Sequence, residues 1–131
     1  MPVTWEIRDQ ILVIIIVGYG GEEPRAVLLE AIASPQFRPG MSVLFDVRLS
    51  TDNSTSDELR SRAQWLSTLQ AEGISSRCAI VVGPKAYQYG LARMAAAHVE
   101  FQGMTLEIFQ DIYEAKRWLS NTAGQDRLVT D

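Results

Sequence analysis

Hydroxyl and carboxylate side chains are concentrated in one short segment, Ser50-Thr51-Asp52-Asn53-Ser54-Thr55-Ser56-Asp57-Glu58. Its last four residues match a capping box, in which a Thr hydroxyl and a Glu carboxylate bind free amides of the first turn of a helix. Helix capping is therefore the simplest role for this segment. A sharper hypothesis makes Ser54, Thr55 or Ser56 a phospho-acceptor or part of a partner-binding loop, because a phosphate is favoured at a helix N-terminus and alters docking there.

A second set of polar residues lies at the ends of apolar segments. Asp46 ends the run Ser42 to Val47, where its carboxylate either anchors the next loop through backbone amides or lines a crevice. Gly83-Pro84-Lys85 opens a helical segment, and a helix N-terminus with a lysine can bind an anion. Further along that segment lie aromatic and basic side chains. The candidate crevice or ligand residues are Asp46, Lys85, Tyr87, Tyr89 and Arg93.

Residue types that catalyse reactions or bind metals are sparse. His98 is the only histidine, and a general base needs a partner that the sequence does not reveal. Cys78 is the only cysteine and opens an apolar run, so it is expected to be a buried, inert thiol. No Gly-x-Ser-x-Gly elbow and no set of ligands with metal-binding spacing occurs. We therefore expect a non-enzymatic protein without a metal.

A glycine-rich turn follows one apolar run, as a dinucleotide-binding motif would. Gly18-Tyr19-Gly20-Gly21 does not complete Gly-x-Gly-x-x-Gly, because Glu23 occupies the sixth position. Neighbouring acids would also repel a pyrophosphate. The turn is thus interpreted as a tight connection between a strand and a helix, and no cofactor is expected.

Composition narrows the remaining classes. The chain has 131 residues, 47% of them hydrophobic and 21% charged, which is typical of one globular domain. A net charge of −4 with scattered basic residues argues against a nucleic-acid partner. The longest apolar run, Ile11 to Val17, is too short to span a bilayer, and no signal peptide precedes it. These features predict a cytoplasmic protein without a membrane span.

Hydrophobic periodicity predicts the element order β-β-α-β-α-β-α-β-α. Val3 to Arg8 alternates as a half-exposed strand does, and Ile11 to Val17 is continuous as in a central strand. We expect an α/β fold with a mostly parallel five-stranded sheet, helices on its faces and an antiparallel first strand. Residues 1–120 form a single domain in this interpretation, and residues 121–131 form a polar tail. The other expected strands are Ser42 to Val47, Arg77 to Val82 and Met104 to Phe109, and the last helix is Asp111 to Leu119.

Three short motifs resemble those of a known family. These are Phe37-Arg38-Pro39-Gly40, Val43-Leu44-Phe45-Asp46-Val47-Arg48 and Tyr89-Gly90-Leu91-Ala92-Arg93-Met94. Together they resemble the SpoIIAA-like (STAS/CRAL-TRIO type) small bacterial domains, over about Val3 to Leu119. The resemblance implies a fold shared with anti-sigma-factor antagonists and with lipid-carrying CRAL-TRIO domains. The branch that it most resembles is largely uncharacterised.

The resemblance also implies two alternative functions. Anti-sigma-factor antagonists are switched by phosphorylation of a serine in Asp-Ser-Ser-Gly at the start of the second helix. This chain has Asp52-Asn53-Ser54-Thr55-Ser56-Asp57 there, without the glycine, so Ser54 and Ser56 match by position alone. The first hypothesis is a non-enzymatic, STAS-like regulatory or protein-partner-binding module. The alternative is carriage of a small apolar or lipid-like ligand, although a chain of this size leaves little room for a pocket of the usual ~300–1,000 Å³. Exposed edge strands would permit a homodimer.

Overall fold

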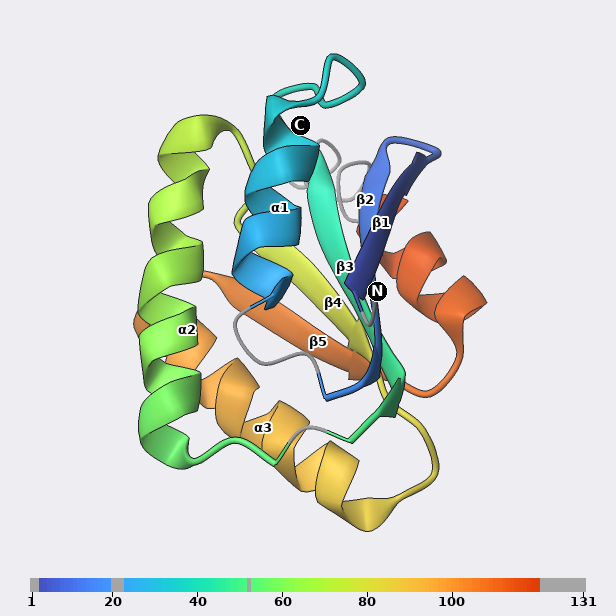
Figure 1. Ribbon diagram of the computed structural model, residues 1–131, viewed down its shortest axis with the longest axis vertical. Coiled ribbons are helices and arrows are strands. Elements are labelled where there is room, and N and C mark those ends of the chain that lie inside the picture. Colours follow the sequence, from blue (N-terminus) through green and yellow to red (C-terminus); the bar gives the residue numbers. More distant parts are fainter. Residues whose placement is uncertain (1–2, 20–22, 52, 121–131) are drawn as a thin grey trace, which may run out of the picture.

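The computed structural model describes residues 3–19, 23–51 and 53–120, and these residues build one five-stranded sheet with helices on both faces (Figure 1). The polar tail expected at residues 121–131 lies outside the described residues, as do Gly20, Gly21 and Asp52. No helix in the described ranges is long and apolar enough to cross a membrane.

The first two strands form an antiparallel hairpin. β1 (Val3–Arg8) pairs with β2 (Ile11–Gly18) along its full length. The turn residues Asp9 and Gln10 have φ values of 54° and 67°. A two-residue turn with positive φ at both positions matches the right-handed twist of the strands that it joins.

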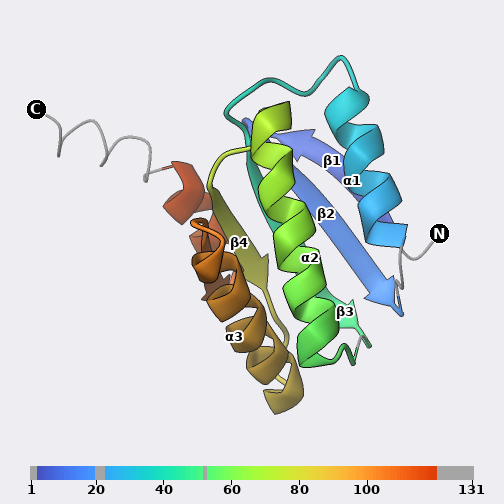
Figure 2. The ribbon, with the colours of Figure 1, turned by 90° about the vertical axis from the view of Figure 1, so that its left-hand side faces the viewer.

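The other three strands are β3 (Ser42–Ser50), β4 (Arg77–Val81) and β5 (Thr105–Phe109). The sheet has the order β1-β2-β3-β4-β5, and β2 to β5 run parallel to one another. Each parallel strand lies beside its predecessor, so right-handed crossovers place the intervening helices on one face. Figure 2 shows α1 (Glu23–Ala33), α2 (Ser56–Thr68) and α3 (Ala86–Phe101) in front of the sheet. The expected fold class is confirmed.

Two apolar layers hold the helices to the sheet. The larger layer joins α1, α2 and α3 to the strands and includes Leu12, Ile14, Leu28, Val43 and Leu66. On the opposite face, the C-terminal helix (residues 112–120) packs Ala115 and Leu119 against Leu44, Ala79 and Val81 (Figure 1). Strand β3 contributes to both layers because successive side chains of a strand point to opposite faces.

Two element boundaries differ by more than one residue from the sequence-based expectation. Strand β3 continues to Ser50 because β2 still pairs with it after a register shift between Ile15 and Val17. Helix α3 begins at Ala86 rather than at Gly83-Pro84. Lys85, directly before the helix, has extended backbone angles, and the Gly83 amide donates to the Gln88 side chain rather than to a helix carbonyl.

Burial of Cys78 leads to a simple test of the core. The thiol is completely buried on β4, and burial raises its pKa to about 12. Because the thiolate is the reactive form, the folded protein should react with a disulfide reagent at pH 8 at least about a hundredfold more slowly than the chain unfolded in guanidinium. Complete labelling of the folded protein at the unfolded rate would contradict this packing.

Candidate functional site

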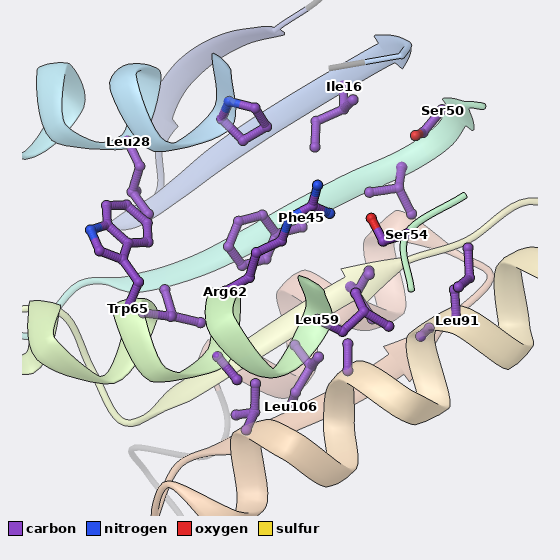
Figure 3. Close-up of a pocket in the computed structure, with 18 of the residues that line it drawn as sticks. Ile16, Leu28, Phe45, Ser50, Ser54, Leu59, Arg62, Trp65, Leu91 and Leu106 are labelled. Carbon is purple, nitrogen blue, oxygen red and sulfur yellow. The ribbon is translucent and has the colours of Figure 1, made fainter. Parts of the chain in front are cut away.

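A pocket of about 190 Å³ lies between α1, α2 and the helix-covered face of the sheet (Figure 3). Helix α1 packs on the β1–β2 hairpin, whereas α2 packs on α3. The pocket occupies the space between α1 and α2 on this face of the sheet. A hydrogen bond from Trp5 Nε1 to Glu30 Oε2 (3.1 Å) ties α1 to the hairpin. The pocket therefore follows from which strand each helix covers.

Most of the pocket surface is apolar. Strand residues form its floor, namely Ile16, Phe45, Val47, Ile80 and Leu106. Side chains of the three helices form its walls, and Leu28, Leu59, Trp65, Leu66, Leu91 and Ala95 are among them.

Two arginines are the charged residues of the pocket in the described part of the chain. The half-buried Arg62 extends from α2 across the pocket, above Phe45, as Figure 3 shows. Arg25 of α1 places its guanidinium carbon 5.3 Å from the centre of the Trp65 ring and its Nη2 3.4 Å from Ser61 Oγ. Arg25 thereby bridges α1 to α2 beside the pocket.

Gln88 closes the polar end of the pocket and holds two segments together. Its side chain, only 6% exposed, accepts a hydrogen bond from the Gly83 amide at 2.8 Å. The Nε2 atom of the Gln88 side chain donates to the carbonyls of Ser50 at 3.0 Å and Val47 at 3.2 Å. Gly83 has to be small, because an added Cβ would lie 2.7 Å from Gln88 Oε1.

The segment after β3 caps α2 as predicted. Thr55 Oγ1 accepts from the Glu58 amide at 3.2 Å, while Glu58 Oε1 accepts from the Thr55 amide at 3.0 Å. The three candidate phospho-acceptors have different environments. Ser54 is 6% exposed and lines the pocket. Thr55 is committed to the cap, whereas Ser56 is exposed.

A serine–histidine contact joins α2 to α3. Ser56 Oγ lies 3.2 Å from His98 Nε2. This partner for His98 is separated from it by 42 residues and was not visible in the sequence. A nucleophile–base pair needs a third group that orients the base, so the contact alone does not make a catalytic site. Across the described ranges, no group of three His, Cys, Asp or Glu side chains is placed to hold a metal ion.

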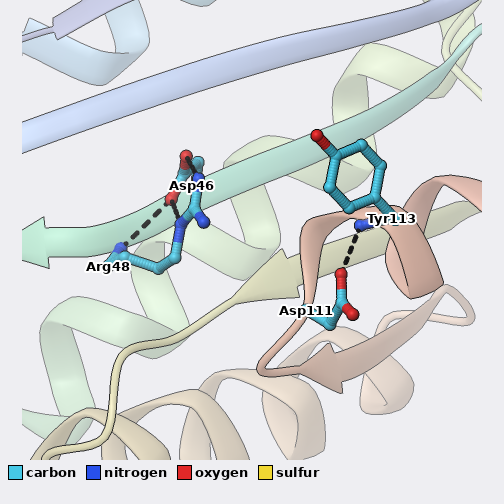
Figure 4. Close-up of polar contacts among 4 residues, drawn as sticks. All are labelled: Asp46, Arg48, Asp111 and Tyr113. Atoms are coloured by element: carbon cyan, nitrogen blue, oxygen red, sulfur yellow. Dashed lines mark hydrogen bonds and ion pairs between the residues drawn. The ribbon is translucent and has the colours of Figure 1, made fainter.

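Asp46 lies on the opposite face of the sheet, away from the pocket (Figure 4). Its carboxylate accepts from Arg48 Nε at 2.9 Å, from Nη2 at 2.8 Å and from the Arg48 amide at 3.2 Å. This hydrogen-bonded carboxylate raises the pKa of Arg48. The geometry matches the anchoring role, because Asp46 holds the irregular end of β3. It also lines a separate hollow of about 280 Å³ with only four other residues.

The other candidate ligand residues do not converge on the pocket. Lys85 precedes α3 and is exposed. The Tyr87 hydroxyl lies 3.5 Å from the Ser50 carbonyl, and Arg93 lies 6.0 Å from the centre of the Tyr89 ring. Neither Lys85, Tyr87, Tyr89 nor Arg93 lines the pocket. The structure brings Arg62, Gln88 and Ser54 together instead.

Two polar pocket residues that were not predicted, Arg62 and Gln88, interrupt the apolar stripes of their helices. Arg62 has helical spacing with Leu59 and Leu66, and Gln88 has it with Leu91 and Ala92. A polar side chain within such a stripe must find a partner or face a cavity, because burying it without one is costly. A polar residue inside an apolar stripe was therefore the sequence signal for Arg62 and Gln88.

The architecture defines an α/β domain with a SpoIIAA-like fold. A solved structure of an uncharacterized protein of the DUF3478 family from Shewanella loihica PV-4, which has a SpoIIAA-like fold, is similar to this chain with a TM-score of 0.57. The similarity covers 89% of this chain and 91% of that chain at 20% sequence identity, so it supports the fold. No family model matches the sequence, and no curated protein matches it.

Proposed function

We propose that this domain binds a small, mainly apolar molecule in the pocket between α1 and α2, and that it does so without chemical catalysis. The observation that carries the proposal is a volume of about 190 Å³ that is lined by side chains of all three helices of that face and by the sheet beneath them. An apolar cavity of about 150 Å³ is sufficient to bind benzene. The pocket can therefore hold one aromatic ring with a short substituent.

Binding would bury apolar surface that water wets poorly. The aromatic residues Phe45 and Trp65 contribute ring surface, and aromatic pairs add to the free energy of area burial. The volume lies below the usual ~300–1,000 Å³ of sites for larger ligands. This size favours a compact ligand over a full-length lipid, and narrows the carrier hypothesis accordingly.

Toluene is a suitable first probe for the apolar pocket. We expect it to bind with a Kd of about 0.1–1 mM, or about −4 to −5.5 kcal/mol, measured by shifts of methyl NMR signals. The signals that move should belong to Leu28, Leu66 and Leu106, which line the pocket. Absence of saturable shifts up to the solubility limit of toluene would contradict the proposed function.

A regulatory, partner-binding role is the second candidate. It is supported by Ser56, which is exposed at the first turn of α2 and contacts His98 across the helix pair. A phosphate there would lie at a helix N-terminus, where negative charge is stabilised. Native mass spectrometry of protein from its own host would separate the candidates, since a phosphoryl adduct favours the regulatory role and a co-purified small molecule favours ligand binding.

A further inference from the structure

The charge of the pocket narrows the ligand class further. The chain as a whole carries a net charge of −4, yet both charged side chains that line the pocket within the described ranges are arginines, Arg25 and Arg62. We propose that the natural ligand is a compact aromatic or branched apolar carboxylate, whose apolar part fills the pocket and whose carboxylate binds Arg62. This inference rests on the proposed function and specifies the chemistry of the same site.

Arg62 has the geometry for this role. It is half-buried, and its side chain crosses the pocket from α2 toward Ile16, with its guanidinium near Ser54 in Figure 3. A guanidinium has five N–H donors in a planar fork, so it can bind a carboxylate through two parallel hydrogen bonds in addition to contacts within the protein. A site with partly excluded water strengthens such charge-assisted bonds.

The neighbouring polar groups favour a carboxylate over a larger anion. Ser50, Ser54 and Gln88 line the same pocket and give it a polar end. Arg25 contributes positive charge while it stacks on Trp65 and contacts Ser61, which keeps its guanidinium at the boundary between α1 and α2. A single principal guanidinium inside an apolar wall suits one carboxylate on an otherwise apolar body.

The volume sets the size of that body. A cavity of about 150 Å³ holds benzene, and the pocket of about 190 Å³ leaves room for one small group beside a ring. Phenylacetate is therefore the probe, and phenylacetamide is its neutral counterpart of nearly equal shape. Toluene has the same ring and one attached carbon, but it lacks the polar group.

The test compares these three probes by NMR titration. We expect phenylacetate to bind about ten- to a hundredfold more tightly than phenylacetamide, as hydrogen bonds to charged groups allow. Arg62→Gln should remove this preference, and circular dichroism should confirm that the variant is folded. Arg62→Lys keeps the charge and should restore part of the preference.

Arg60, two residues before Arg62 on the same helix, offers a matched control. Arg60 is exposed, and its Nη2 pairs with Asp57 Oδ1 at 2.7 Å outside the pocket. Arg60→Gln removes the same charge and should retain the preference for phenylacetate. Equal loss in Arg60→Gln and Arg62→Gln would overturn the assignment to Arg62, since it would indicate a general effect of protein charge.

The two proposals fail in different ways. If toluene binds but wild-type protein does not distinguish phenylacetate from phenylacetamide, the carboxylate inference is overturned and the apolar binding function stands. If neither toluene nor phenylacetate binds, both proposals are contradicted.

Discussion

Replacing Gln88 with leucine should lower the free energy of unfolding by about 2–4 kcal/mol, because backbone groups of β3 and of Gly83 would lose the side chain that they bond. The Gly83 amide and the carbonyls of Ser50 and Val47 all bond the Gln88 side chain in the folded protein. Leucine preserves the volume but supplies neither a donor nor an acceptor. The expected result is a lower midpoint of urea denaturation with an unchanged m value.

Gln64 on α2 offers the matched control. It is exposed, so Gln64→Leu makes the same chemical change on a helix surface and should alter the free energy of unfolding by less than about 0.5 kcal/mol. A loss below that limit in Gln88→Leu would show that the bridge between β3 and α3 does not contribute to stability as the hydrogen bonds indicate.

Filling the pocket from α3 should weaken ligand binding. Ala95 lines the pocket, and phenylalanine at this position would place its own ring in the space assigned to the ligand. We expect Ala95→Phe to weaken toluene binding at least about tenfold, which corresponds to 1.4 kcal/mol. Overpacking would lower stability by about 1–3 kcal/mol, so circular dichroism should confirm that the variant is folded at the titration temperature.

Ala97→Phe provides the same substitution on the same helix, at an exposed position outside the pocket. This variant should bind toluene as the wild-type protein does. Unchanged binding in Ala95→Phe would mean that toluene occupies a different place, and it would remove the pocket from the proposed function.

Much of the fold could be predicted because its strands and helices have distinct periods. The continuous run Ile11 to Val17 and the alternating run Val3 to Arg8 predicted the central strand and its antiparallel neighbour, and both are confirmed. The capping box at Thr55 to Glu58 was also visible, because its residues are close in sequence and bond each other directly.

The pocket could not be predicted in the same way, because it is the space left between elements that are distant in sequence. Its existence depends on α1 covering the hairpin while α2 packs on α3, which periodicity does not determine. Lys85, Tyr89 and Arg93 were predicted as ligand candidates at and after the start of a helix, but they lie outside the pocket. The more useful signal was Arg62 within the apolar stripe of α2.

Asp46 illustrates a limit of reasoning from strand ends. Its position at the end of a buried strand fitted both a crevice acid and a loop anchor. In the structure, the Arg48 side chain and amide both bond the carboxylate, next to the register shift between β2 and β3. Such an irregularity depends on pairing with a neighbouring strand and has no local sequence signature.

The most direct measurement of the central claim is a crystal structure of the protein soaked with bromobenzene, whose bromine is located by anomalous scattering. We expect one bromine peak between α1 and α2, above Phe45 and beside Leu66, and no such peak in Ala95→Phe crystals soaked in the same way. A bromine peak elsewhere on the molecule, or an unoccupied pocket in the soaked wild-type protein, would contradict it.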